Sequence, residues 1–373
     1  MRQLAHWFLA LIAVCLSACE QSARADQNIV HPTPENLPSA RELASVIGTD
    51  TLSEHQELDQ LARRLRRAST ILRIGDAEGS DDAIFGLVED VAADARGRIL
   101  VLDSQMKRLR IYSQDGRLVF AVGRGGEGPY EFQAPEALDL DSQGQVLVAD
   151  RFNKVKIFGP QEDSVEYLDV VRLELVPEDM CALGDRFFVQ AWHSSETVIH
   201  EYSSSGLLRS FGDPYRTANP LVQNQLSDGP IGCSRAGLVL MMPKYLPFLH
   251  AYDSTRTRRW VSRIEAFTPL QITEQTGVGG RPEVAFKVKG PFHVAHTITA
   301  LHDQYVLVQV ARSDEVSVRQ RAEYASLQSY VIDAASGDGV YLGDHLPTIF
   351  AGNGNRLYGA VSDPFPQVHV LRF

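Results

Sequence analysis

Histidine is the first residue type in this chain whose spacing could build a reactive centre, because imidazole serves as metal ligand and general base. The candidates are His193, His293, His296, His302 and His345. His293 and His296 are three residues apart, so on a strand their side chains would point to opposite faces. Neither an HExxH pair nor a GxSxG nucleophile motif occurs. The sequence therefore predicts no catalytic residue, no metal site and no cofactor.

A glycine-rich segment, GRGGEGP (123–129), is a second candidate for chemistry because such turns can bind phosphate. It follows an apparent strand but precedes no helix, so the helix N-terminus that would attract an anion is missing. The chain also has a formal net charge of −11 at pH 7. An acidic protein repels phosphate backbones, and we expect no nucleic-acid partner.

Two segments of the chain repeat each other. DARGRILVLD (94–103) and DSQGQVLVAD (141–150) align at an offset of 47 residues, and Phe85 and Phe132 precede them at the same offset. A period in the forties, with strand, glycine turn and strand, is typical of a β-propeller blade.

The aspartates of this repeat could form a site or cap turns. Asp94 and Asp141 precede the glycine turn, and Asp103 and Asp150 end the second strand of each copy. Because these positions recur from copy to copy, we interpret them as turn caps.

The same strand pattern predicts an all-β, six-bladed propeller over residues 69–373. We place the blades near 88–122, 136–170, 178–212, 230–264, 296–343 and 348–373. The last blade has only three strands. Residues 71–74 align with the outer strand at 119–122 and could supply the fourth, which would close the ring and leave no blade edge unpaired.

Residues 123–158 resemble NHL-type repeats and the six-bladed propeller lipoproteins of bacterial envelopes. Asp150, Asn153, Lys154 and the pair Ile157-Phe158 match the family pattern of an acid, a polar turn, a basic residue and an apolar strand. The resemblance implies a binding scaffold. A minority of similar propellers are metal-dependent lactonases, lyases or cyclases, which leaves a hydrolase or lyase as the alternative function.

Ligand contacts on a propeller are expected on the face where blade-to-blade connections and the loops between middle strands meet. Basic residues with neighbouring aromatics could attract an anionic or carbohydrate-like ligand or an acidic peptide; solvated loop residues are the simpler interpretation. The candidate ligand-binding residues on this face are Arg124, Glu127, Tyr130, Arg151, His193, Lys244, Arg312 and His345.

The N-terminus resembles a bacterial lipoprotein signal peptide. Residues 1–18 combine Arg2 with an apolar run too short to anchor in a bilayer, and LSAC (16–19) resembles the lipobox. That resemblance implies cleavage before Cys19 and acylation of its thiol, with palmitate among the expected lipids. Glu20 is not the Asp that retains such lipoproteins in the inner membrane, so we expect an outer-membrane lipoprotein facing the periplasm.

Between the lipid anchor and the propeller, residues 19–40 are polar and rich in proline, which predicts a flexible tether. Residues 41–68 are expected to contain a helix, with Ser53 and Gln56 as a capping box. Arg63 and its basic neighbours suit the end of that helix.

Once Cys15 is removed and Cys19 is acylated, the only thiols left are those of Cys181 and Cys233, at equivalent positions in their repeats. In an oxidising compartment we expect them on adjacent inner strands, joined as a disulfide; two buried free thiols are the alternative. The long connection 267–297 is expected to contain an extra strand near 284–289 and a glycine turn at 277–280, and to act as a lid.

Taken together, these features predict a monomeric, envelope-anchored binding or scaffolding module. Its expected partners are the membrane, through the lipid on Cys19, and an envelope protein, peptide or carbohydrate.

Overall fold

The computed structural model describes residues 34–50, 55–79, 83–192, 196–276, 280, 282–288, 290–302, 304–314 and 326–373. The signal peptide, Cys19, Ser53, His193, Gly277 and Gly279 lie outside these residues.

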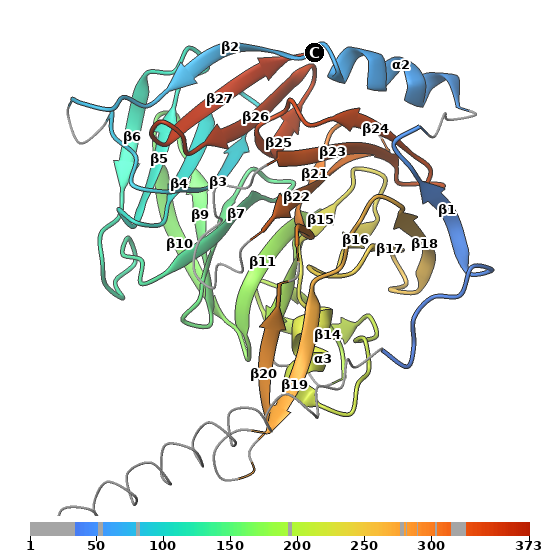
Figure 1. The fold of residues 1–373 in the computed structure, drawn as a ribbon. Coiled ribbons are helices and arrows are strands. Elements are labelled where there is room, and N and C mark those ends of the chain that lie inside the picture. Colours follow the sequence, from blue (N-terminus) through green and yellow to red (C-terminus); the bar gives the residue numbers. More distant parts are fainter. Residues whose placement is uncertain are drawn as a thin grey trace, which may run out of the picture.

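The described residues form six sheets around a central axis (Figure 1). Each inner strand packs against the inner strand of the next blade, and that of blade six packs against that of blade one. Blades one to three contain β3 (Val88–Ala93), β4 (Ile99–Asp103), β5 (Arg108–Tyr112) and β6 (Leu118–Val122); β7 (Pro135–Leu140), β8 (Val146–Asp150), β9 (Lys154–Pro160) and β10 (Val165–Arg172); and β11 (Val176–Leu183), β12 (Arg186–Trp192), β13 (Ile199–Ser203) and β14 (Gly206–Phe211).

Blades four to six continue the same antiparallel order. They contain β15 (Ile231–Cys233), β16 (Val239–Met241), β17 (Phe248–Tyr252) and β18 (Arg258–Ile264); β21 (Phe292–Ala300), β22 (Tyr305–Ser313), β23 (Ser326–Asp333) and β24 (Gly339–Gly343); and β25 (Thr348–Asn353), β26 (Arg356–Val361) and β27 (Gln367–Arg372), with β2 (Ser69–Ile74) as outermost strand. The predicted six-bladed propeller is confirmed.

Closure of the ring joins the two ends of the propeller. β2 pairs antiparallel with β27, with Leu72 opposite Val370 and Ile74 opposite Val368. Blade six is thus built from both ends of the domain, as expected from the alignment of residues 71–74.

Burial explains the composition of the strands. All five residues of β4 and of β8 are buried, because a middle strand lies between two neighbouring blades. The outer strand β6 is mostly half-buried. Middle strands therefore read as continuous apolar runs, whereas outer strands tolerate polar residues.

The segment before the propeller differs from expectation. Residues 41–68 contain a strand as well as a helix: β1 (Leu43–Ile47) pairs parallel with β18 and gives blade four a fifth strand. The helix α2 (Gln56–Leu65) begins later than a capping box at Ser53 requires, and its N-cap, His55, makes no side-chain capping bond. Packing holds it instead, because its buried Leu58, Leu61 and Leu65 cover blades five and six.

The repeated aspartates cap turns and connections. Asp94 Oδ1 accepts hydrogen bonds from the Arg96 and Arg98 amides, and Asp141 Oδ1 accepts them from Gln143 and Gln145. The glycines of these turns, Gly97 and Gly144, have φ of 78° and 75°, which favours glycine.

Asp103 and Asp150 have a different capping role. Asp103 accepts the amides of Gly86 and Leu87, and Asp150 accepts those of Gln133 and Ala134. Each buried carboxylate therefore fixes the connection that enters its own blade.

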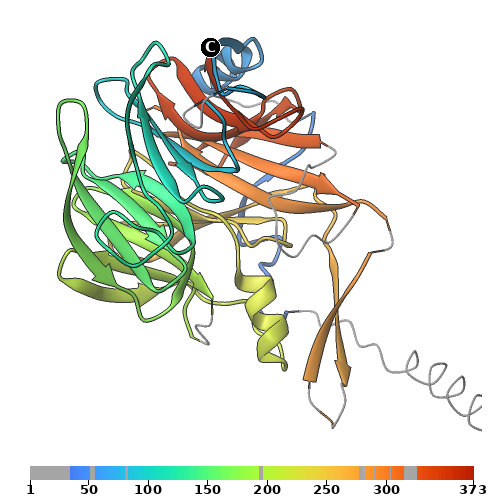
Figure 2. The same cartoon turned by 90° about the vertical axis from the view of Figure 1, so that its left-hand side faces the viewer.

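The long connection 267–297 forms a hairpin. β19 (Gln271–Thr276) pairs antiparallel with β20 (Pro282–Lys287), so it contains two strands rather than the single strand expected near 284–289. The hairpin extends away from the propeller beside α3 (Pro220–Ser227), as Figures 1 and 2 show. Its strands pair with each other and pack beside α3, and its action as a lid stays a prediction.

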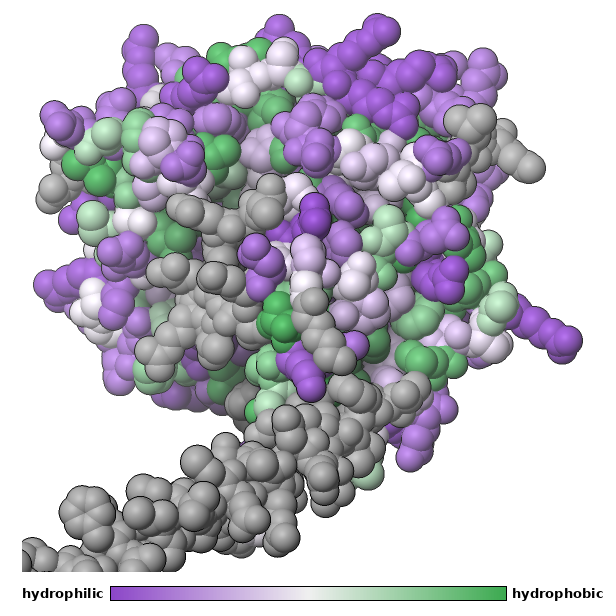
Figure 3. Space-filling model, in the orientation of Figure 1, coloured by the Kyte–Doolittle hydropathy of each residue, from purple (hydrophilic) through white to green (hydrophobic). Residues whose placement is uncertain are grey.

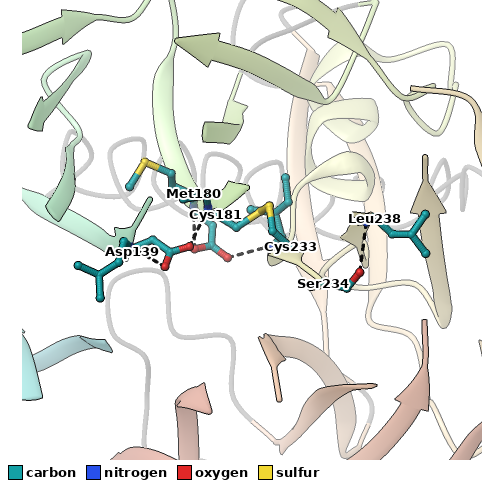
Figure 4. The surroundings of a disulfide bond; sticks show 10 residues. Asp139, Met180, Cys181, Cys233, Ser234 and Leu238 are labelled. Carbon is teal, nitrogen blue, oxygen red and sulfur yellow. Dashed lines mark hydrogen bonds between the residues drawn. A yellow bond between two sulfur atoms is a disulfide. The ribbon is translucent and has the colours of Figure 1, made fainter. Parts of the chain in front are cut away.

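The structure contains the disulfide expected between Cys181 and Cys233 (Figure 4). Their Cα atoms are 5.5 Å apart, and the bond joins inner strands β11 and β15 of adjacent blades. Both side chains are buried beside Phe188 and Ile231. The bond therefore links blades three and four near the axis.

Replacing both cysteines by serine is expected to lower the free energy of unfolding by roughly 2–4 kcal/mol, because the bond closes a loop of 52 residues. Denaturant titration of the variant and the parent measures this loss. Alkylation of the denatured, non-reduced protein without residues 1–19 should find no free thiol; two alkylated thiols per chain would contradict the bond.

Candidate functional site

The connections between successive blades, and those between the second and third strands of each blade, share one face because the strands alternate in direction. We call this the loop face. In the view of Figure 3, hydrophilic and hydrophobic residues are interspersed over the surface.

Three of the predicted ligand residues lie in the connection 123–134, between blades one and two. Arg124 forms an ion pair with Glu131 at 2.6 Å, which lies in the same connection. Glu127 Oε1 accepts a hydrogen bond from Gln133, and the Tyr130 hydroxyl accepts one from the Tyr167 amide. The first two contacts lie within the connection, and the third holds it against blade two.

Two other predicted residues belong to a charge cluster nearer the axis. Arg151 contacts Glu178 at 2.5 Å and Glu136 at 3.8 Å, so its charge is neutralised within the protein. Lys244 lies in the same cluster and lowers the pKa of Asp228, but burial dominates and raises that pKa to about 6. The cluster links blades two, three and four.

The remaining predicted residues are not brought to either place. Arg312 is exposed near the end of β22, and His345 lies in the connection from β24 to β25. His193 lies outside the described residues. The structure therefore divides the predicted binding residues between two clusters and two separate positions.

Beside the connection 123–134 is a cavity of about 290 Å³. We call it the cation–aromatic pocket; its lining residues are Glu127, Gly128, Pro129, Gln133, Phe152, Lys154, Lys156, Tyr167, Val170 and Arg172. Sequence reasoning placed only Glu127 of this set in a binding site, although Tyr130 bonds to Tyr167 at its edge.

Strand register brings the cations of the pocket together. Lys154 and Lys156 are two residues apart on β9, so both point to the face that meets blade one. Arg172 of β10 lies directly opposite Lys154, and Val170 opposite Lys156. The pocket therefore has one wall of paired strands and another formed by the connection 127–133.

Lys156 holds that second wall in place. Its side chain is almost fully buried, and its ammonium donates to the carbonyl oxygens of Gly128 and Glu131. Burial, and then the nearby charge of Lys154, lower its pKa. It also lies over the Phe132 ring at 5.5 Å, as the equivalent Arg110 lies over Phe85 at 4.9 Å. Lys156 is therefore a structural cation, and Arg110 has the equivalent place in blade one.

Lys154 and Arg172, unlike Lys156, can still contact a ligand. Lys154 Nζ donates to Gln133 Oε1 at 2.7 Å, and within the described part of the chain neither cation has a carboxylate partner. Phe152, beside them, is 57% exposed. The pocket thus presents two cations and an aromatic ring to solvent in a protein of net charge −11.

A second, larger cavity of about 470 Å³ lies on the axis, lined by the inner strands of all six blades. Asp139 accepts the Leu140 amide at 2.7 Å and the Ala182 amide of the next blade at 2.7 Å, and Asp179 bonds to Ile231 in the same way. Burial raises the pKa of Asp139 to about 6, against the effect of those bonds. These carboxylates connect blades.

Metal-binding side chains do not converge on the axis or elsewhere in the described ranges, which hold no group of three or more suitable His, Cys, Asp or Glu residues. Of the histidines considered as metal ligands, His296 contacts the Thr348 hydroxyl, and His293 accepts a hydrogen bond from the Thr268 amide. Among the helices that the structure describes, none is long and apolar enough to cross a membrane.

The chain is similar to proteins that share this fold. A family described as a 6-bladed beta-propeller (DUF5128) matches residues 78–206. Human NHL repeat-containing protein 3 is 38% identical over 76 residues, which cover 19% of this chain and 21% of that protein. The chain therefore spans about a fifth of the length of this relative, and the matches support the NHL-like propeller.

Solved structures resemble the chain over most of its length. An exported protein from Bacteroides fragilis, so described, has a TM-score of 0.53 and 10% identity, covering 89% of this chain and 99% of that one. A DUF4221 protein from Bacteroides vulgatus has a TM-score of 0.50 and 8% identity, covering 82% and 97%. These likenesses establish the fold alone.

Proposed function

We propose that this NHL-like six-bladed β-propeller is an envelope-anchored binding module, tethered by lipid on Cys19, that engages a ligand on its loop face. The observation that carries the proposal is the cation–aromatic pocket, which opens at the connection 127–133. Its walls are held by buried contacts. The positive charges of Lys154 and Arg172 are opposite in sign to the net charge of the protein. Binding sites commonly combine such apolar walls with a few placed polar groups.

Binding rather than catalysis also agrees with the hydrogen bonding of the axial acids. Asp90, Asp139 and Asp179 each accept a backbone amide from the next blade, so their oxygens already have partners. A hydrolytic metal centre would need several ligands free to converge on one ion.

Elemental analysis and turnover assays distinguish the binding module from a metal-dependent hydrolase or lyase. The protein without residues 1–19, purified from a metal-replete medium, should contain less than one equivalent of transition metal and should not turn over a panel of lactones and esters. A stoichiometric metal that is required for turnover of any substrate on the panel would overturn the proposal.

The anchor is tested by lipid labelling. Replacing Cys19 by serine is expected to abolish incorporation of labelled palmitate and to release the protein from the membrane fraction, since acyl chains supply most of the membrane affinity. Replacing Cys15, which precedes the expected cleavage site, is the matched control and should leave labelling unchanged. Equal labelling of the Cys19→Ser variant and the parent would refute the anchor.

A further inference from the structure

We propose that the cation–aromatic pocket binds a sugar that carries a carboxylate, such as a uronic acid unit of a polysaccharide. This inference rests on the proposed binding function and adds the class of ligand. It starts from the two signs of charge on the lining: the cations Lys154 and Arg172 on the strands, and the carboxylate of Glu127 on the connection.

The cationic wall fits an anionic group. Arg172 lies opposite Lys154 on paired strands, and neither side chain contacts a carboxylate among the described residues. A guanidinium presents two parallel N–H donors, which match the two oxygens of a carboxylate. The ligand therefore carries a carboxylate directed toward β9 and β10.

The opposite wall requires hydroxyl groups on the same ligand. Glu127 Oε1 accepts a hydrogen bond from Gln133 at 3.2 Å, and Gln133 Oε1 accepts one from Lys154 at 2.7 Å. An ionised carboxylate only accepts hydrogen bonds, so the group facing Glu127 must donate. Sugar hydroxyls donate and are neutral, whereas a second acidic side chain of a peptide would be repelled there.

Size and shape favour a sugar ring over an extended peptide. The cavity of about 290 Å³ is at the lower end of ligand pockets and admits a single ring with its substituents. Of the two strands that line it, β9 is paired along both edges, with β8 and β10, and the carbonyl oxygens of Gly128 and Glu131 are held by Lys156. A peptide would therefore find few backbone partners in the pocket, while the exposed Phe152 ring offers a flat apolar face to a pyranose.

Isothermal titration of the full-length protein in mild detergent tests this inference. The probes are tetragalacturonate, the neutral tetragalactose and the acidic peptide tetraglutamate. Tetragalacturonate should bind, and Arg172→Glu should weaken it by about tenfold or more, since each factor of ten corresponds to about 1.4 kcal/mol. Arg117→Glu is the control with the same change of charge and should leave the affinity unchanged, because Arg117 is 85% exposed and lies outside the pocket.

Glu127→Gln separates a sugar from a peptide. It should weaken tetragalacturonate by about threefold to tenfold through loss of the charged acceptor, and it should strengthen any binding of tetraglutamate by removing repulsion. Equal affinity for tetragalactose, or insensitivity to Arg172→Glu, would overturn the inference. Tighter, Arg172-dependent binding of tetraglutamate would overturn the sugar assignment and leave the proposed binding module standing.

Discussion

Removing residues 1–75 is expected to give a protein that aggregates, whereas the protein without residues 1–19 should stay in solution and unfold cooperatively. The deletion removes β2, the outermost strand of blade six, and leaves the edge of β27 without its partner. It also removes Ile74, which packs with Phe85, Val88 and Val368 where blade six meets blade one. An unpaired strand edge beside exposed apolar residues promotes association between chains. Light scattering and thermal unfolding of the two proteins measure the effect.

A matched pair of substitutions in the full-length chain isolates the closing strand from α2 and β1. Ile74 is 7% exposed and Ile71 is 42% exposed, although both are isoleucines of the same strand. Ile74→Asp should lower the free energy of unfolding by about 3 kcal/mol or more, because it buries an unpaired charge or detaches β2. Ile71→Asp should change it by less than about 0.5 kcal/mol. Equal stability of the two variants would refute closure by β2.

Most of the propeller could be predicted because its blades repeat. The offset of 47 residues aligns turn aspartates, glycines and strand ends, and each follows from a local requirement that the structure shares. The closing strand could be predicted for the same reason, since residues 71–74 align with β6. The strand β1 could not be predicted, because its parallel pairing with β18 joins segments that are about two hundred residues apart and follows no repeat.

The binding residues were predicted less well, because tertiary pairing decides which charges remain available. Arg124 and Arg151 are on the expected face, but Glu131 and Glu178 neutralise them. Arg172 was missed because its place opposite Lys154 depends on a bulge in the pairing of β9 with β10. The alternating cations Lys154 and Lys156, on one face of a strand, were the available signal.

The charge network around Glu201 was also missed, and it makes the strongest prediction for a single side chain. Glu201 of β13 is fully buried and accepts hydrogen bonds from Arg186 at 2.8 Å, Arg209 at 2.6 Å and Arg256 at 2.7 Å. Arg256 comes from blade four and lies 4.6 Å over the ring of Phe188 of blade three. The network therefore joins blades three and four through a carboxylate that no local motif identifies.

Glu201→Gln is expected to lower the free energy of unfolding by about 3–5 kcal/mol, because it leaves the buried Arg256 without its counter-charge. Arg186→Gln is the matched control: its side chain is 42% exposed, so an effect of about 1 kcal/mol or less is expected. Denaturant titrations at pH 7 compare the two. A midpoint for Glu201→Gln within error of the parent would show that the network contributes little.

The same network predicts how stability depends on pH. Burial alone would raise the pKa of Glu201, but hydrogen bonds from Arg256, Arg209 and Arg186 outweigh it and lower the pKa to about 2. Because the folded protein holds this proton less tightly than the unfolded chain does, the stabilisation is complete above the ordinary value of 4.5. It is lost as the pH falls from there toward 2. The stability difference between the parent and Glu201→Gln should therefore shrink between pH 4.5 and pH 2. A difference that stays constant over this range would assign the loss at pH 7 to packing rather than to charge.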